Sequence, residues 1–184
     1  PAVRRGIPVF VGSSKDPAAG GTRVCNETRN PPLFRALALR RKQTLLTLHS
    51  LNMLHTFGFL AELFNILARH NVSVDLITTS EVSVALTLDT TGSTSTSASL
   101  LTQALLTELS SLCRVEVEED LALVAIIGNQ LSKACGVGKE VFGVLDPFNL
   151  RMICYGASSY NLCFLVPGND AESVVRTLHR NLFE

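Results

Sequence analysis

Apolar residues recur with helical spacing in the stretch from Met53 to Glu81, which reads MLHTFGFLAELFNILARHNVSVDLITTSE. A period of three to four residues predicts an amphipathic helix, and its apolar side is formed by Phe59, Leu60, Leu63, Phe64 and Leu67. We expect Asn71 to close this helix, because asparagine tolerates the left-handed conformation of a helix C-cap. The β-branched run Val72–Thr79 predicts a strand that carries a single acid, Asp75.

Alternating apolar and polar residues predict further strands on both sides of this helix. The strands are expected at Phe34–Arg41, Thr44–Ser50, Val82–Asp89 and Arg114–Glu118, and a second helix is expected over Leu100–Leu109. From Thr44 onward the order is strand, helix, strand, strand, helix, strand. This order is typical of a ferredoxin-like α/β (α+β) sandwich.

The chain then repeats itself at an offset of 78 residues, which places Gly58 on Gly136. The same offset, without a gap, aligns Phe64 with Phe142, Leu67 with Leu145 and Asn71 with Asn149. Such a repeat indicates two copies of one βαββαβ unit. Asp75 and Glu81 become Ile153 and Ser159 in the second copy. We therefore predict that the first copy binds a ligand and that the second is scaffold.

The second copy ends before its fourth strand, which would leave an unpaired sheet edge. Phe34–Arg41 is a spare strand with no place in the first copy. We infer that the first unit is inserted within the second: residues 34–42 complete the second unit, 43–119 form the first and 120–184 form the rest of the second. Residues 1–33, which are rich in turns and end near Pro32, are expected to be the tail of another domain and a linker.

The stretch around the first helix also suggests a chemistry. A glycine turn at Thr56–Gly58 that opens a helix presents free N–H groups, which suit a carboxylate. Asp75 suits an ammonium group. An isolated aspartate is often simply solvated, but Ser73 and Ser80 lie near it in the sequence and its counterpart in the repeat is apolar. Together these features predict a receptor for a free amino acid.

Composition narrows the alternatives. The 16 basic and 16 acidic residues cancel, which argues against nucleic acid and anionic membranes; a ferredoxin-like RNA-recognition module would also need paired sheet aromatics. The longest apolar run, Leu121–Ile127, is too short to span a bilayer. Five cysteines without a C-x-x-C pair and four scattered histidines indicate no metal site. A reduced cytoplasmic setting fits best.

The chain resembles the regulatory region of aspartokinases, in particular the lysine-sensitive type. The resemblance is carried by Phe34–Arg41, Gly58–Glu62, Val72–Ser83 and the closing Asn181–Glu184, and the units are similar to ACT domains. It implies lysine held between the first ACT units of two subunits. The matching ligand-binding positions are Met53, Thr56, Gly58, Phe59, Leu60, Ser73, Val74, Asp75, Ser80 and Glu81. Thr56 and Phe57 stand where the family pattern has a smaller hydroxyl and a basic residue.

The resemblance also implies partners and limits. It implies a homodimer through the ACT domains, a kinase catalytic domain to which residues 1–25 belong as its last strands, and ATP and Mg²⁺ as cofactors of the whole enzyme only. This chain has no catalytic residue of its own and is expected not to phosphorylate aspartate alone; an ATP-turnover assay tests the opposite case. By chemistry alone threonine or methionine would serve as well as lysine, and a stand-alone sensor subunit is the alternative architecture.

Overall fold

The computed structural model describes residues 2–25, 30–54, 57–88 and 101–184. The chain divides into two units, Pro1–Pro32 and Leu33–Glu184. In the first, strands β1 (Val9–Gly12) and β2 (Gly21–Val24) form an antiparallel hairpin, accompanied by two short 3-10 helices, Val3–Arg5 and Pro17–Ala19. Every residue of both strands is exposed, so the hairpin has no apolar core of its own among the described residues.

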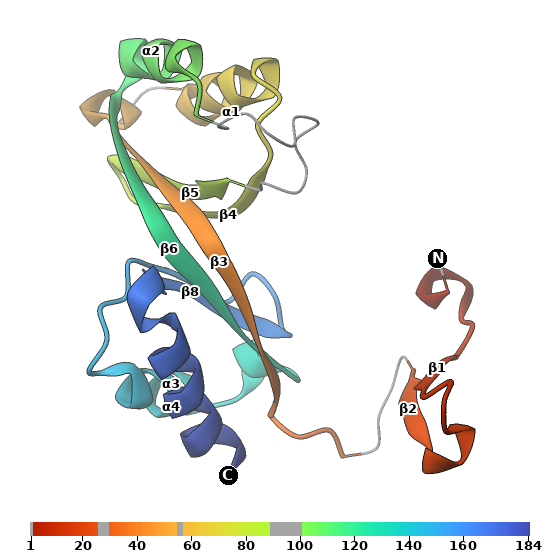
Figure 1. Cartoon of the computed structure of the whole chain (residues 1–184). Helices are drawn as coiled ribbons and strands as arrows, with labels where there is room; N and C mark the ends of the chain where they lie inside the picture. The colour runs from red at the N-terminus through yellow and green to blue at the C-terminus, as the bar shows by residue number, and fades with distance from the viewer. Residues whose placement is uncertain (1, 26–29, 55–56, 89–100) are drawn as a thin grey trace. The chain divides into compact units, whose positions relative to one another are not determined.

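One antiparallel sheet organises the second unit (Figure 1), and its strand order is β4-β5-β3-β6-β8-β7. The strands are β3 (Phe34–His49), β4 (Val74–Thr79), β5 (Ser83–Leu88), β6 (Arg114–Gly128), β7 (Met152–Cys154) and β8 (Asn161–Pro167). The two central strands, β3 and β6, have 16 and 15 residues and run through both halves of the sheet.

Each half of the sheet is one ferredoxin-like unit. In the first, Leu45–His49 of β3 pairs with β5 and with the beginning of β6, and helices α1 (Phe59–Arg69) and α2 (Gln103–Leu112) lie over the sheet (Figure 1). In the second, β6 continues between β8 and Phe34–Arg40 of β3, with helices α3 (Val137–Leu145) and α4 (Ala171–Phe183). The beginning of β3 therefore supplies the fourth strand of the second unit, as the predicted insertion requires.

The strand boundaries differ from those predicted at the centre of the sheet. Phe34–Arg41 and Thr44–Ser50 are not two strands but parts of β3, and the predicted strand at 114–118 continues to Gly128. Lys42 and Asp120 have φ 55° each, and the β3–β6 register shifts beside them. This left-handed geometry makes a bulge within a continuous strand rather than a turn.

The helices agree more closely with the predictions. Asn71 has φ 54° directly after α1, in the left-handed conformation expected of it. Helix α2 runs from Gln103 to Leu112, so it extends beyond the predicted end. The predicted start at Leu100 and the predicted loop at 90–97 lie outside the described residues.

Three apolar clusters stabilise this unit. One lies between the sheet and α1 and α2, another between the sheet and α3 and α4, and the third lies on the opposite face and contains residues of both halves, including Leu45, Leu121 and Leu165. In Phe34–Arg41 only one face is covered: Phe34, Leu37 and Leu39 contact the cluster beneath α3 and α4, whereas Ala36 and Ala38 are exposed. The edge strands β4 and β7 approach each other, since the thiol of Cys154 donates to the carbonyl of Ile77 at 3.5 Å. The sheet is thus curled around the third cluster.

Candidate functional site

Asp75, the predicted ammonium receptor, is held in an ion pair. Its Oδ2 accepts a hydrogen bond of 2.6 Å from Nη1 of Arg40, and the Asp75 side chain is 30% exposed. The strand itself carries no other charge, as the sequence indicates, and the partner of this acid comes from another strand. Its partner lies 35 residues earlier, on the part of β3 that belongs to the second unit. The carboxylate does not extend freely into bulk water.

The two residues line a surface depression of about 360 Å³. Its other lining residues come from β3, β4, β6 and β8 and are Ala38, Leu39, Leu76, Leu123, Ala125, Asn161 and Cys163. A carboxylate beside apolar walls can bind a cation that is carried on an aliphatic stem. Of the predicted ligand-binding residues that the structure describes, only Asp75 lines this depression.

A bulge in β4 sets the position of Asp75. The register with β5 shifts between Val74 and Ile77, and the N–H of Leu76 donates to the hydroxyl oxygen of buried Thr87 at 3.0 Å instead of to a strand carbonyl. Bulges of this kind redirect the side chains of an edge strand. Ser73 and Val74, which precede it, are half-buried, and Val74 packs against the core beneath α1 and α2.

The second predicted element, the opening of α1, has the expected backbone. Gly58 has φ 87° at the N-cap, and no side chain caps the helix. The first N–H groups of a helix lack intrahelical acceptors and carry partial positive charge, so this turn can bind an anion. Leu60 is partly exposed, whereas Phe59 is 5% exposed and belongs to the core. Thr56 lies outside the described residues.

The remaining predicted residues lie on two other segments. Met53 ends a short 3-10 helix and packs against the first core. Ser80 and exposed Glu81 form the turn between β4 and β5, where the hydroxyls of Ser80 and Ser83 are 2.6 Å apart. No depression found among the described residues is lined by both Asp75 and the α1 turn. On a single chain, the predicted residues therefore remain in separate groups.

The second unit has closed the equivalent region with its own chain. Leu131, the counterpart of Met53, is buried; its N–H donates to the carbonyl of Ser159 at 2.8 Å, and the hydroxyl of Tyr155 donates to its carbonyl at 2.5 Å. Ile153 replaces Asp75. Met53 instead donates its N–H to Ser50 at 3.1 Å within its own short helix. This difference supports a binding role for the first unit alone.

The chain is similar to one known domain family and to known aspartokinases. Residues 124–182 match the model of the ACT domain family. The whole chain is 84% identical to Escherichia coli lysine-sensitive aspartokinase 3 and 36% identical to Arabidopsis thaliana aspartokinase 1, chloroplastic, and it spans 41% and 33% of their lengths. It also matches a crystal structure of E. coli aspartokinase III in complex with lysine and aspartate (T-state), with 83% identity, a TM-score of 0.88, and coverage of 100% of this chain and 40% of that chain.

The chain belongs to the aspartokinase family. It corresponds to the ACT-containing region of the aspartokinases that it matches. The ACT domain match covers much of the second unit. The first unit of this aspartokinase region has the same strand order about the shared strands β3 and β6, so both halves have the ACT topology.

Cys163, which lines the depression with Asp75, has a perturbed thiol. Burial raises the pKa of the Cys163 thiol to about 11, and the negative charges of Cys154 and Asp75 add to this effect. The described residues contain no group of three or more His, Cys, Asp or Glu side chains that could hold a metal ion. None of the helices in the described part of the chain is both long and apolar enough to cross a membrane.

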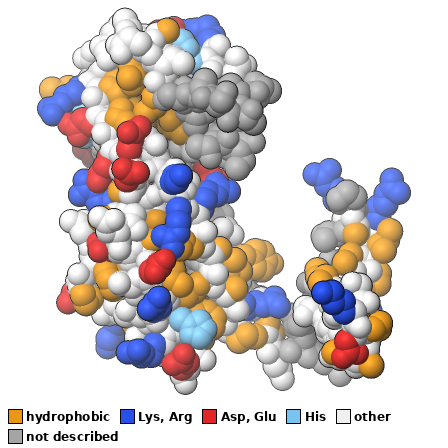
Figure 2. Space-filling view, viewed as in Figure 1, with side chains coloured by type: hydrophobic (Ala, Val, Ile, Leu, Met, Phe, Trp, Pro, Cys, Tyr) orange, Lys and Arg blue, Asp and Glu red, His pale blue; other side chains and the backbone are white. Residues whose placement is uncertain are grey.

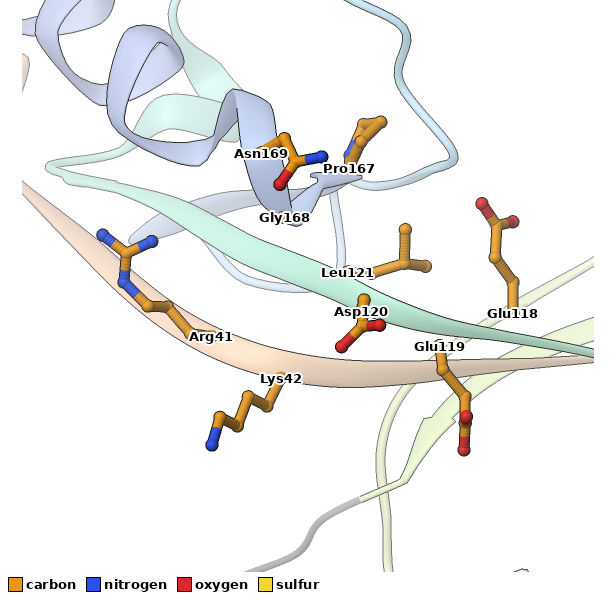
Figure 3. A pocket seen from close by; sticks show the side chains of 9 residues that line it. All are labelled: Arg41, Lys42, Glu118, Glu119, Asp120, Leu121, Pro167, Gly168 and Asn169. Carbon is orange, nitrogen blue, oxygen red and sulfur yellow. The ribbon is translucent and has the colours of Figure 1, made fainter.

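Arg40 is the site residue that sequence reasoning missed. A signal was present, because the repeat offset places Arg40, Arg41 and Lys42 on Glu118, Glu119 and Asp120. All of these residues except Arg40 line a second depression of about 390 Å³ at the bulges (Figure 3). In Figure 3 the side chains of Arg41 and Glu118 extend to one side of the strands and those of Lys42 and Glu119 to the other. These charged side chains therefore do not point toward one common position.

Proposed function

We propose that this region is the lysine sensor of an aspartokinase and that lysine binding feeds back on the phosphorylation of aspartate by ATP in the whole enzyme. The carrying observation is Asp75, which is the one acid lining the aliphatic depression; the second unit has Ile153 at the equivalent position. Lysine places an ammonium group on Asp75 and its α-carboxylate on the N–H groups that open α1. The E. coli relative, to which this chain is 84% identical, is named lysine-sensitive.

The complete site is proposed to form between two copies of the chain. No depression lined by described residues alone contains both Asp75 and the α1 turn, and a two-fold arrangement would present the α1 turn of one subunit to the other subunit's edge strand. Exposed Leu51, Phe57 and Leu60 lie close to that turn in the sequence and supply apolar area for such a contact. In Figure 2 hydrophobic side chains lie on the surface of this upper half of the second unit. The homodimer is thus part of the proposal.

Lysine favours the subunit arrangement that binds it better, and the population shifts toward that arrangement. Couplings of this kind typically amount to about 1–3 kcal/mol, or a change of roughly 5- to 150-fold. The kinase domain, with its ATP and Mg²⁺, would be supplied by the rest of the whole enzyme. A cytoplasmic setting, where the five cysteines stay reduced, belongs to the same proposal.

Isothermal titration of the chain with lysine tests the site. The wild type should bind lysine, and Asp75→Asn should lose most of that affinity while its circular dichroism and melting temperature stay near those of the wild type. Asp146→Asn is the matched control, because Asp146 is an exposed aspartate in the second unit. Unchanged lysine affinity in Asp75→Asn would remove Asp75 from the site.

Two further measurements complete the test. Threonine and methionine titrated in parallel decide the ligand, since either would satisfy a carboxylate-plus-ammonium site. In the whole aspartokinase, lysine should inhibit the wild type and spare the Asp75→Asn variant, whereas equal inhibition of both would contradict the proposal. Sedimentation of the chain with and without lysine measures the proposed association of two copies.

A further inference from the structure

We propose that Arg40 is a tethered competitor for the ligand: its guanidinium occupies the carboxylate of Asp75, and lysine binds by displacing it. This inference rests on the proposed function, because it concerns how the same site is regulated. The observation that carries it is the Arg40–Asp75 ion pair at 2.6 Å, in which the cation comes from the protein and the anion is the proposed ammonium receptor.

The pair has the properties of a replaceable contact. The side chains of Arg40 and Asp75 are 45% and 30% exposed, so water and solutes reach both. Exposed ion pairs of this kind contribute little to stability, because water and salt screen both charges. Among the described residues, no other acid forms an ion pair with Arg40. Its long side chain can therefore leave Asp75 at little cost, and an incoming ammonium group keeps the carboxylate paired.

The second unit shows what the same position does when no ligand is involved. Glu118, the counterpart of Arg40, accepts hydrogen bonds from Nε and Nη2 of Arg151 at 2.9 and 2.6 Å. Arg151 lies directly before the edge strand β7, as Asp75 lies on the edge strand β4. Both pairs link an edge strand to a long central strand, with the charges reversed. Only in the first unit does the edge strand carry the acid.

Displacement would also carry a signal to the second unit. Arg40 lies on the part of β3 that pairs with β6 at Leu123, within the second unit. Its neighbour Arg41 donates to Glu172 on α4 at 2.9 Å. Exchange of Arg40 for a ligand therefore changes a contact between the ligand-binding strand β4 and the scaffold unit. Such a difference in contacts between two states is what coupling requires.

The test compares lysine affinity in Arg40→Gln and Arg41→Gln with that of the wild-type chain. The two variants remove the same charge from adjacent positions, but only Arg40 contacts Asp75, since Arg41 pairs with Glu172. If Arg40 competes with the ligand, Arg40→Gln should bind lysine about two- to five-fold more tightly, the range expected for loss of an exposed ion pair. Arg41→Gln should bind like the wild type. Equal or weaker binding by Arg40→Gln would overturn the inference and would show that the Arg40–Asp75 pair has only a structural role.

The salt dependence of lysine affinity distinguishes displacement of Arg40 from a purely structural role of the Arg40–Asp75 pair. In the wild type, lysine exchanges one ion pair for another, so affinity should vary little between about 50 and 500 mM salt. In Arg40→Gln the ligand forms a new ion pair, which salt screens, so its affinity should fall more steeply. Parallel salt profiles for the two proteins would contradict displacement.

A double-mutant cycle with Asp75→Asn identifies the residue through which Arg40 acts. If Arg40 competes for Asp75, Arg40→Gln should not change residual lysine affinity in the Asp75→Asn background. An equal gain in both backgrounds would assign the effect to long-range charge and overturn the inference. Absence of lysine binding to the wild-type chain would instead overturn the proposed function, and the inference with it.

Discussion

Lys42 and Asp120 occupy equivalent positions in the two halves of the molecule, 78 residues apart, and both have φ 55°. Next to them Gln43 pairs with Leu121, its own counterpart in the repeat. A local two-fold axis therefore passes between β3 and β6 at this point. The two bulges let each long strand leave one unit and enter the other without ending.

We predict that these bulges tolerate glycine but not a β-branched residue. Lys42→Val should destabilise the chain by roughly 1–2 kcal/mol, because a branched Cβ is strained in the left-handed region. Lys42→Gly should be close to neutral, since relief of strain offsets the greater entropy of the unfolded chain. Urea denaturation of both variants measures the difference. Equal stability of the two would show that the left-handed conformation does not constrain this position.

Truncation of the scaffold core should be costly. Phe164 on β8 is fully buried beneath α3 and α4, and Phe164→Ala should lower the free energy of unfolding by about 3–5 kcal/mol. Tyr160→Ala is the control, because Tyr160 is an aromatic residue of the same unit that is 64% exposed. Its stability should stay within about 0.5 kcal/mol of the wild type. Comparable losses in the two variants would contradict the burial pattern.

Thiol labelling should separate the cysteines. Because the pKa of Cys163 is raised to about 11, only about one Cys163 thiol in a thousand is thiolate at pH 8, and the thiolate is the reactive form. Burial restricts access as well. Exposed Cys135 should react with iodoacetamide first, and Cys163 only after denaturant is added. Mass spectrometry of timed digests measures both, and equal rates in the native chain would refute the assignment.

Acid should weaken the contact between α1 and α2. Arg69 and His70 donate hydrogen bonds to the carboxylate of Glu108, and these bonds lower the pKa of Glu108 below its usual value. A depressed carboxyl pKa contributes stability above the unfolded-state pKa of about 4.3, and this contribution disappears as the pH falls through the folded-state value.

Glu108→Gln should therefore be less stable than the wild type at pH 7, and the difference should shrink as the pH falls below about 4. Melting temperatures of both proteins between pH 7 and pH 3 measure it. Exposed Glu81, which forms no ion pair among the described residues, provides the control variant Glu81→Gln. A gap that is constant over this range would exclude Glu108 as its source.

Local features were predictable from the sequence because their causes are local. A glycine before an apolar helix and an asparagine after it, at Gly58 and Asn71, specified both ends of α1. The nested architecture was predictable because a missing strand and a spare strand occurred in one sequence. The continuity of β3 was not, since Lys42-Gln43 resembles a turn and only pairing with β6 on both sides of it keeps the strand extended.

The surroundings of Asp75 could not be predicted in the same way. Arg40 and Asp75 lie on β3 and β4, which are separated in the sheet by β5. Strand β5 pairs only with Leu45–His49 of β3, so Arg40 lies beyond that pairing, and the curled sheet brings it to β4. A contact of this kind depends on register and curvature, which the hydrophobic pattern of a single strand does not specify. The reversal of charge between Arg40–Lys42 and Glu118–Asp120 in the repeat marked this segment as unusual but did not identify the partner of Arg40.

Because β3 and β6 each belong to both units, the second unit cannot be lost by a simple deletion from the gene. Its removal would delete about half of β3 and half of β6, and the first unit would lose the support of those halves. Recombination that replaced one unit by another would likewise need its junctions within β3 and β6, at the bulges, because no linker separates the two units. The sharing of both central strands is therefore enough to keep the two copies together in one chain.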